Sequence, residues 1–189
     1  MDVIGQFRPK KCVTNNKEYT MKKQGFTLIE LMVVIVIMGI LAAVAVPKLF
    51  GMIAKSKASE VGPAAGEYIK LQDAFVSELN QFVGSFKVIG YKMNDGNVFH
   101  YTDNLPGSAT DGTTGIAANG SATAALTITS QVGLNDCKTS STWILFEQAA
   151  ADGNGLKWTA GIGDGATATT SVFAPNCVVL TPSFKSLEN

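Results

Sequence analysis

A long apolar run near the N-terminus limits the fold more than any other part of this sequence. It extends from Phe26 to Val46, and Glu30 is its one charged residue. As a helix, its 21 residues would span roughly 31 Å, close to the thickness of the hydrocarbon core of a bilayer. A helix this apolar on every side is not typical of a globular core. The run therefore predicts a membrane-spanning helix.

The charges around this run predict its orientation. Lys22 and Lys23 precede it, and only Lys48 follows it closely, which favours an N-terminus on the cytoplasmic side. Residues 1–25 hold six basic groups and two acids, whereas residues 26–189 hold nine lysines and thirteen acids. The net charge of residues 26–189 is mildly negative, so this part of the chain has no positive electrostatic field that would attract nucleic acid, and nucleic-acid binding is not indicated.

Three interpretations of the segment compete. The first is a plain signal anchor. The second is a cleaved secretory signal peptide, which the Ala43-Val44-Ala45 site supports but the length of the run opposes. The third uses Gly25, which stands after two lysines and directly before the run. A membrane protease on the cytoplasmic side could cut there, removing the basic leader and keeping the helix.

The segment resembles the type IV pilins and the pseudopilins of type II secretion. The residues that carry the resemblance are Lys22-Lys23-Gln24-Gly25-Phe26-Thr27-Leu28-Ile29-Glu30, then Leu31 to Val46 with Gly39 inside and Pro47 at the end. The resemblance implies cleavage after Gly25 by prepilin peptidase and N-methylation of Phe26. It also implies a precursor in the bacterial cytoplasmic membrane, which the pilus assembly machinery converts into an extracellular homopolymer with these helices at its centre.

Glu30 admits two roles. A carboxylate in the bilayer centre costs roughly 2.5–3.5 kcal/mol, and less near an interface. In the first turn of a helix, the positive end of the helix dipole offsets part of that cost, so Glu30 could simply cap its own helix. Alternatively, cleavage creates an amine at Phe26, and Glu30 of a neighbouring subunit could pair with it. Because an unpaired buried charge is strongly penalised, such a pair would select the axial register of a filament.

The sequence suggests four parts. Residues 1–25 form the leader, which would shorten to five residues if translation began at Met21, and which we exclude from the fold. Residues 26–47 form the membrane or filament-core helix, with a helix break at Pro47. In a packed filament this break could let the helix extend locally. Residues 48–83 continue the helix, and residues 84–189 form a globular head.

The helical continuation is amphipathic. Its apolar residues recur at steps of three and four and predict one buried face: Val61, Ala65, Tyr68, Leu71, Phe75, Leu79 and Phe82. Glu67, Lys70 and Asp73 would face solvent. Gly62-Pro63 should kink the helix, with Pro63 in the first turn of the second piece.

The remainder predicts an antiparallel sheet that covers this helical face, an α+β head. Candidate strands are Phe86–Met93, Val98–Tyr101, Leu126–Thr129, Trp143–Glu147, Leu156–Ala160, and Ser171–Phe173 with Val178–Leu180. Candidate turns are Asn94–Asn97, Asp152–Gly155 and Gly163–Gly165. The segment from Gly107 to Ser130 is rich in Ser, Thr, Ala and Gly, and we expect a long exposed loop there.

Cys137 and Cys177 remain after removal of the leader, which contains Cys12. In an exported domain, a disulfide between them is expected, because an exported free thiol is disfavoured; two separate thiols are the alternative. Closing a loop of this length stabilises a fold by roughly 4 kcal/mol in the chain-entropy model. The bond would fasten the C-terminal region to the sheet, as in many pilins.

Catalytic patterns are sparse, so we expect no enzyme, no cofactor and no metal. The single histidine, His100, lies in a predicted strand and is expected to be structural. Gly161–Gly165 departs from a phosphate-binding pattern and predicts a turn. Asp152–Gly155 has too few ligands for a calcium loop. Asn119-Gly-Ser121 matches a glycosylation sequon, which is a weak signal by itself.

Three functions remain open at this point. The first is a structural subunit of a type IV pilus used in adhesion or motility, which the large disulfide-closed region and the expected long loop favour. The second is a pseudopilin of a type II secretion system. The third is a membrane-anchored protein of another class whose anchor only looks pilin-like. A methylated N-terminus at Phe26, and the chain in sheared fibres, would exclude the third.

Overall fold

The computed structural model describes residues 25–79, 82–91, 93–105, 112–118, 120–152 and 155–189. The chain divides into two compact units, residues 1–42 and 43–189, which we describe separately. Helix α1 (Leu28–Ala58) begins in the first unit and ends in the second. In the described part of the chain, one helical stretch, which begins at Leu28, is long and apolar enough to cross a membrane. This agrees with the expected membrane helix.

Pro47 lies inside α1, and the helix continues to Ala58. The helix break predicted at Pro47 is therefore not seen in the single chain, and a local break inside a filament stays a prediction. A shorter interruption at Ser59 and Glu60 precedes α2 (Val61–Leu79). Pro63 sits in the first turn of α2, where a proline without an N–H is tolerated. The interruption of the helix thus lies at Ser59 and Glu60 rather than at Gly62-Pro63, where a kink was predicted.

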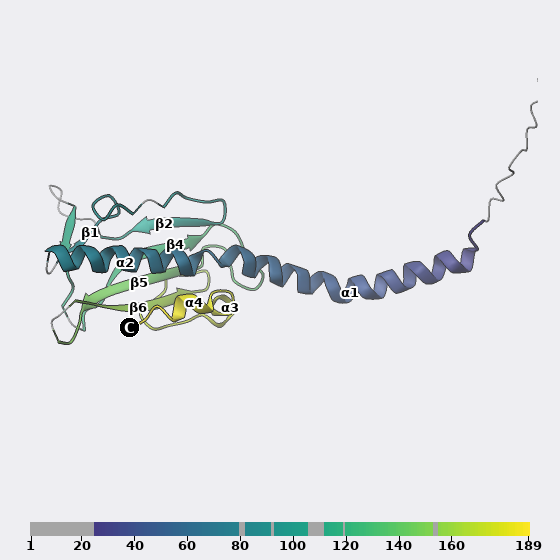
Figure 1. Ribbon diagram of the computed structural model, residues 1–189. Helices are drawn as coiled ribbons and strands as arrows, with labels where there is room; N and C mark the ends of the chain where they lie inside the picture. Colours follow the sequence, from purple (N-terminus) through teal and green to yellow (C-terminus); the bar gives the residue numbers. More distant parts are fainter. Residues whose placement is uncertain (1–24, 80–81, 92, 106–111, 119, 153–154) are drawn as a thin grey trace, which may run out of the picture. The chain divides into compact units, whose positions relative to one another are not determined.

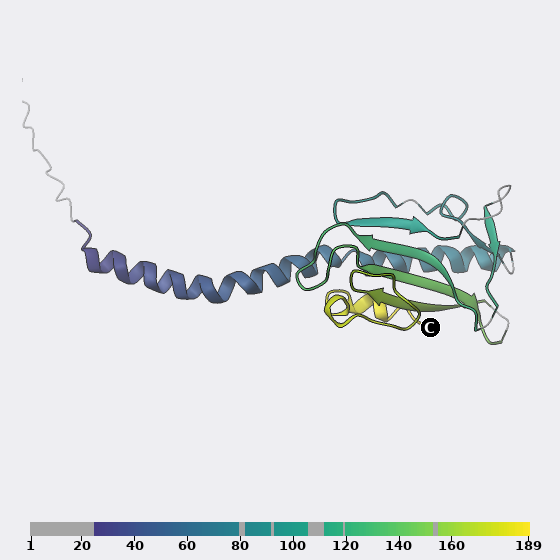
Figure 2. The same ribbon diagram turned by 180° about the vertical axis from the view of Figure 1, so that it is seen from behind.

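The amphipathic pattern is confirmed over most of α2 but is wrong at its end. Val61, Ala65 and Tyr68 are completely buried, whereas Glu67, Lys70 and Asp73 are exposed. Leu79 and Phe82, which were also predicted on the buried face, are about half exposed, and the helix ends at Leu79 rather than at residue 83, because Phe82 already belongs to the strand β1 (Phe82–Gly84). This buried face packs into the hydrophobic core of the head, together with the inward side chains of the sheet. Figures 1 and 2 show α2 lying along one face of the sheet.

The head contains a four-stranded antiparallel sheet in the order β2-β4-β5-β6. The strand bounds are β2 (Phe99–Asp103), β4 (Thr123–Ser130), β5 (Thr142–Ala149) and β6 (Leu156–Gly163). A separate pair joins β1 (Phe82–Gly84) to β3 (Thr113–Gly115). Consecutive strands of the larger sheet are neighbours, as predicted for a meander. The structure therefore has the predicted α+β architecture, a helix packed on an antiparallel sheet.

The centre of the head lies between α2 and the sheet. Trp143 and Trp158 are fully buried on the face of the sheet that contributes to the main core. Tyr68 packs edge-to-face against Trp158, with ring centroids 6.0 Å apart. Ile144 and Phe146 lie in a second, smaller cluster with Ala168. Because both faces of β5 are covered, its side chains are buried along the strand rather than alternately.

Four strand predictions are confirmed and two are wrong. The predicted runs beginning at Leu126, Trp143 and Leu156 fall in β4, β5 and β6, and the run beginning at Val98 overlaps β2, which starts one residue later. The run Phe86–Met93 forms no strand over its described residues, because Val88 and Ile89 both donate their N–H groups to the carbonyl of Ser85 and close a turn.

The C-terminal strand predictions are also wrong. Phe173 makes only an isolated bridge to Ile162, and Val178 ends the short helix α3 (Pro175–Val178). A second short helix, α4 (Pro182–Lys185), follows. Each helix carries a proline at its start, a position where proline favours helix over strand.

The expected long loop from Gly107 to Ser130 is wrong in its described part, because β3 and the whole of β4 lie within it. Ala125, Leu126 and Ile128 in β4 are completely buried, so this segment rich in small residues forms a packed strand.

The turns had mixed outcomes. β5 and β6 pair antiparallel on either side of Asp152–Gly155, as predicted, although residues 153 and 154 lie outside the described residues. Asn94–Asn97 joins no hairpin, because no strand directly precedes it among the described residues. The turn predicted at Gly163–Gly165 overlaps β6, because Gly163 is the last residue of that strand.

Candidate functional site

The start of α1 carries a hydrogen-bonded cap. Thr27 precedes the first helical residue, Leu28, and its backbone N–H donates to Glu30 Oε2 at 3.0 Å. The Thr27 hydroxyl donates to the same oxygen at 2.8 Å, while the Glu30 N–H donates to Thr27 Oγ1 at 3.3 Å. This reciprocal arrangement is a capping box, in which Thr and Glu three residues apart satisfy each other's backbone donors. It explains locally why the helix begins at Leu28.

The capping box is the first of the two roles predicted for Glu30. Both donors from Thr27 go to Oε2, and among the described residues no hydrogen bond to Glu30 Oε1 is found. A carboxylate has about four acceptor positions, so capping leaves capacity for a further donor. The self-capping geometry is therefore compatible with the second role.

The surface around Glu30 is apolar and uncovered within its own unit. Phe26 is 81% exposed and Leu28 is 85% exposed, and large apolar side chains remain exposed along α1 as far as Ile53. Phe26, Ile29, Glu30, Val33 and Val34 line one shallow concave surface. An extended apolar surface of this kind marks contact with a membrane or with other protein.

Gly25 and Phe26 are both exposed, and a side chain added at Gly25 would meet nothing within 4 Å. The peptide bond between Gly25 and Phe26 is therefore exposed. A Cβ added at Gly39 would likewise meet nothing within 4 Å. The small size of Gly39 is not needed for packing within the described part of this chain, so it is available for a close contact with another helix.

The predicted disulfide is present. Cys137 and Cys177 are joined with a Cα–Cα distance of 4.9 Å, and both are completely buried. Trp143 Nε1 donates to Thr181 Oγ1 at 2.8 Å, which adds a second link between the C-terminal region and the sheet. The two sulfurs lie near Asp164, but sulfurs bonded to each other are not the thiolates that a metal site needs.

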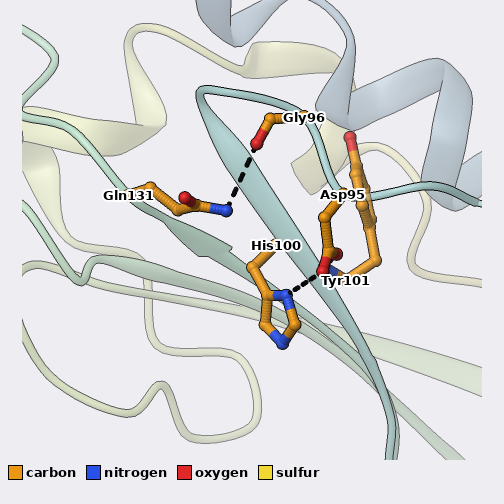
Figure 3. Close-up of polar contacts among 5 residues, drawn as sticks. All are labelled: Asp95, Gly96, His100, Tyr101 and Gln131. Carbon is orange, nitrogen blue, oxygen red and sulfur yellow. Dashed lines mark hydrogen bonds and ion pairs between the residues drawn. The ribbon is translucent and has the colours of Figure 1, made fainter.

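His100 is half exposed and pairs with Asp95, as Figure 3 shows. Its Nδ1 lies 2.6 Å from Asp95 Oδ2, while Asp95 Oδ1 accepts the N–H of Tyr101 at 3.1 Å. That N–H holds the pKa of the Asp95 carboxyl below its usual value. Gln131 donates to the carbonyl of Gly96, so the whole set fixes the loop before β2 to the edge of the sheet. This is the structural role expected of His100.

The remaining candidate motifs do not form ligand sites in the described part of the chain. Gly161 and Gly163 lie in β6, where a Cβ would collide with the carbonyl oxygens of Thr169 and Ala166, so these glycines permit a close chain crossing rather than phosphate binding. The Asp152–Gly155 segment lies partly outside the described residues, and Asn119 lies outside them.

Two polar residues that sequence reasoning missed organise these regions. The Thr27 cap had a signal, since Thr-x-x-Glu before an apolar run is typical of a capping box. Asp164 accepts hydrogen bonds from Lys138 and Asn176, the neighbours of the two cysteines. No sequence pattern indicated this role, because these partners are distant from Asp164 in the sequence.

Comparisons with known proteins agree with this geometry. Residues 20–46 match the family model "Prokaryotic N-terminal methylation motif". The type IV major alpha-pilin of Moraxella bovis is 34% identical over 134 residues, which cover 69% of this chain and 82% of that protein. The type IV major pilin protein PilA of Myxococcus xanthus is 39% identical over 80 residues, or 42% of this chain. A type IV major fimbrial protein FimA of Dichelobacter nodosus is 51% identical over 45 residues, or 24% of this chain.

The extent of these similarities differs. The aligned part covers only 36% of the Myxococcus protein and 29% of the Dichelobacter protein. No solved structure matches the chain. The Moraxella similarity, however, extends through most of both chains, and the methylation motif coincides with the exposed start of α1. The chain therefore belongs to the type IV pilin family.

Proposed function

We propose that the mature chain is a structural subunit of a type IV pilus, which polymerises through its N-terminal helix into a surface filament for adhesion or motility. The observation that carries the proposal is the uncovered apolar surface of α1, which runs from Leu28 to Ile53. Such a surface is stable in a bilayer before assembly and against other copies afterwards. The relatives, each named as a major pilin or fimbrial protein, support the same role.

Processing forms the first step of this proposal. Prepilin peptidase cuts the exposed bond between Gly25 and Phe26, and the new N-terminus at Phe26 is methylated. The matched methylation motif supports this step. Lys22 and Lys23 hold the leader on the cytoplasmic side, which gives a single-pass precursor with its head outside. Residues 1–25 are then lost, residues 26–47 enter the filament core, residues 48–83 join the core to the head, and residues 84–189 form the exposed head.

Assembly in register forms the second step. Cleavage leaves a positive amine at Phe26, and the filament core excludes water. An amine there is costly unless a carboxylate of a neighbouring subunit pairs with it. Glu30 caps its own helix by accepting the two hydrogen bonds from Thr27 at Oε2, and Oε1 retains the capacity to accept another. Glu30 of one copy therefore accepts from the Phe26 amine of the next copy, and subunits that are out of register leave both charges unpaired.

Three variants separate this pairing from helix capping. Glutamine can replace glutamate in a capping box, so Glu30→Gln keeps the cap and removes only the charge. Glu30→Ala removes both. Thr27→Val keeps the charge and removes the capping hydroxyl, which costs about 1 kcal/mol of local helix stability. If the pair sets the register, both Glu30 variants are cleaved at Gly25 but give few fibres, while Thr27→Val still assembles.

The assay is the yield of sheared surface fibres, with the mass of the membrane-bound subunit as the control for cleavage. Normal fibre yield from Glu30→Gln would show that capping alone is needed, and would refute the pairing. Loss of fibres in Thr27→Val together with full assembly of Glu30→Gln would assign the whole effect to the cap.

A further inference from the structure

The ends of the disulfide-closed region are joined by a carboxylate as well as by sulfur. Asp164 Oδ1 accepts the backbone N–H of Lys138 at 2.9 Å, and Oδ2 accepts the side-chain amide of Asn176 at 3.1 Å. Lys138 directly follows Cys137, and Asn176 directly precedes Cys177. One side chain therefore connects the two segments that carry the cysteines.

This connection is anchored to the sheet. Ser141, which is buried and directly precedes β5, donates its hydroxyl to the Lys138 carbonyl at 2.7 Å. The same hydroxyl oxygen accepts the N–H of Gly165 at 2.9 Å, next to Asp164. The N–H of Ser141 in turn donates to Ser130 Oγ at 3.0 Å. Asp164 is thus held at a fixed place relative to the rigid strands.

The carboxylate is also close to the bond itself. One ligand atom from each of Cys137, Cys177 and Asp164 lies within 4.8 Å of the others. The Lys138 N–H holds the pKa of the Asp164 carboxyl below its usual value. Asp164 is consequently charged at neutral pH, and hydrogen bonds to a charged acceptor are roughly twice as strong as neutral ones.

We propose that Asp164 is a positioning residue for formation of the Cys137–Cys177 disulfide. The cysteines are 40 residues apart in the chain, so closing the loop carries an entropy cost before the sulfurs meet. By binding Lys138 and Asn176, Asp164 holds the two segments together before the sulfurs bond, and its hydrogen bonds offset much of this entropy cost. The reduced head therefore already holds its two thiols side by side.

The covalent step needs an external disulfide, such as oxidised glutathione or the disulfide of an envelope oxidoreductase. One cysteine thiolate attacks this disulfide, forming a mixed disulfide and releasing one thiol of the oxidant. The second cysteine thiolate attacks the protein sulfur of the mixed disulfide, forming the Cys137–Cys177 bond and releasing the other thiol. Two electrons pass to the oxidant, and the two cysteine protons end on its thiols. Asp164 takes no covalent part.

The test measures the equilibrium between the thiols and the disulfide in the full-length chain in detergent, with Cys12→Ser so that only two thiols react. Samples are equilibrated in glutathione buffers from both the reduced and the oxidised side, acid-quenched, alkylated and weighed by mass spectrometry. Asp136→Asn is the matched control, because Asp136 is an exposed carboxylate next to Cys137 that accepts only from the neighbouring Asn135 side chain, at 2.9 Å, among the contacts of the described residues.

Asp164→Ala should lower the equilibrium constant for closure by about tenfold or more, since it removes charge-assisted hydrogen bonds from both segments. Asp164→Asn should give a smaller loss, because its amide oxygen accepts only one of them, and Asp136→Asn should stay within about twofold of the parent. An equilibrium constant for Asp164→Ala equal to that of the control overturns the proposal.

A general structural role is distinguished by a second measurement. If Asp164 merely stabilises the head, its removal lowers the urea stability of the Cys137→Ser/Cys177→Ser chain and leaves the closure constant unchanged in the chain with both cysteines. That result also overturns the proposal. Should Asp164→Ala not fold, Asp164→Asn decides, because it preserves the shape of the side chain.

Discussion

Gln72 gives the sharpest test of how the head is held together. This residue of α2 is completely buried. Its side-chain amide bonds to the backbone N–H and C=O of Gly84 in β1, as a neighbouring strand would. Nε2 donates to the Gly84 carbonyl at 2.6 Å, and Oε1 accepts the Gly84 N–H at 3.0 Å. Nε2 also donates to the hydroxyl of Tyr68 at 2.9 Å. Replacing Gln72 by leucine keeps most of the volume and removes all three bonds.

The expected loss of stability depends on the polar groups that this substitution leaves behind. The N–H and C=O of Gly84 would remain buried without these partners, at about 1–3 kcal/mol for each group. Gln72→Leu should therefore lower the free energy of unfolding of the head by about 4 kcal/mol. For a chain of this size, each kcal/mol lowers the midpoint of thermal unfolding by about 2–4 °C, so we expect a drop of about 8–16 °C.

The assay is urea and thermal unfolding of the full-length chain in detergent, followed by the fluorescence of the buried Trp143 and Trp158. Gln131→Leu is the control, because Gln131 is exposed and its side chain donates a single bond to Gly96 at 3.2 Å. The control should change stability by less than about 0.5 kcal/mol. Equal stability of the Gln72→Leu and Gln131→Leu chains would show that the buried amide does not hold β1 to α2.

Two further predictions concern packing and pH. Gly161→Ala should destabilise the head by about 1–3 kcal/mol, because the new methyl group would collide with the carbonyl of Thr169, whereas Gly115→Ala, with open space around it, should be near neutral in the same unfolding assay. Burial raises the pKa of the Glu147 carboxyl, although its bond from the Ala117 N–H opposes the shift. A raised pKa in the folded state means that proton binding favours folding, so Glu147 destabilises most at neutral pH and this penalty is relieved as the pH falls toward 4.5. Glu147→Gln should thus be more stable than the parent at pH 7, with the difference shrinking on acidification; a constant difference across urea titrations from pH 7 to pH 4.5 would contradict this.

Much of the helical part of the fold could be predicted because its patterns are local. The buried face of α2 was visible in the spacing of Val61, Ala65 and Tyr68, and the structure buries all three. The long run of β5 was visible in Trp143–Glu147. The pairing of Cys137 with Cys177 followed because only these two cysteines remain outside the leader.

The errors arise where tertiary contacts override local preference. Phe86–Met93 has the composition of a strand, yet Phe86 and Tyr91 both pack edge-to-face on Tyr68, which a closed turn permits. Gly90, with a φ of 70°, adopts the left-handed conformation that such a turn needs. Strand propensity mostly reflects how a side chain packs, so it fails when the packing partner is distant in sequence.

The site shows the same division. Gly25, Phe26 and Glu30 could be chosen from the sequence because one short motif contains them. Asp164 could not, since its partners Lys138 and Asn176 come together only in the folded head. No sequence spacing would have linked them.

We propose that this chain is cut before Phe26 and then assembles through the exposed helix. The most direct test is the intact mass and N-terminal sequence of the chain taken from fibres sheared off cells that express it. We predict a subunit that begins with methylated Phe26 and lacks residues 1–25. A chain recovered only from the membrane with its leader intact, or one that begins at Val46, would contradict this claim.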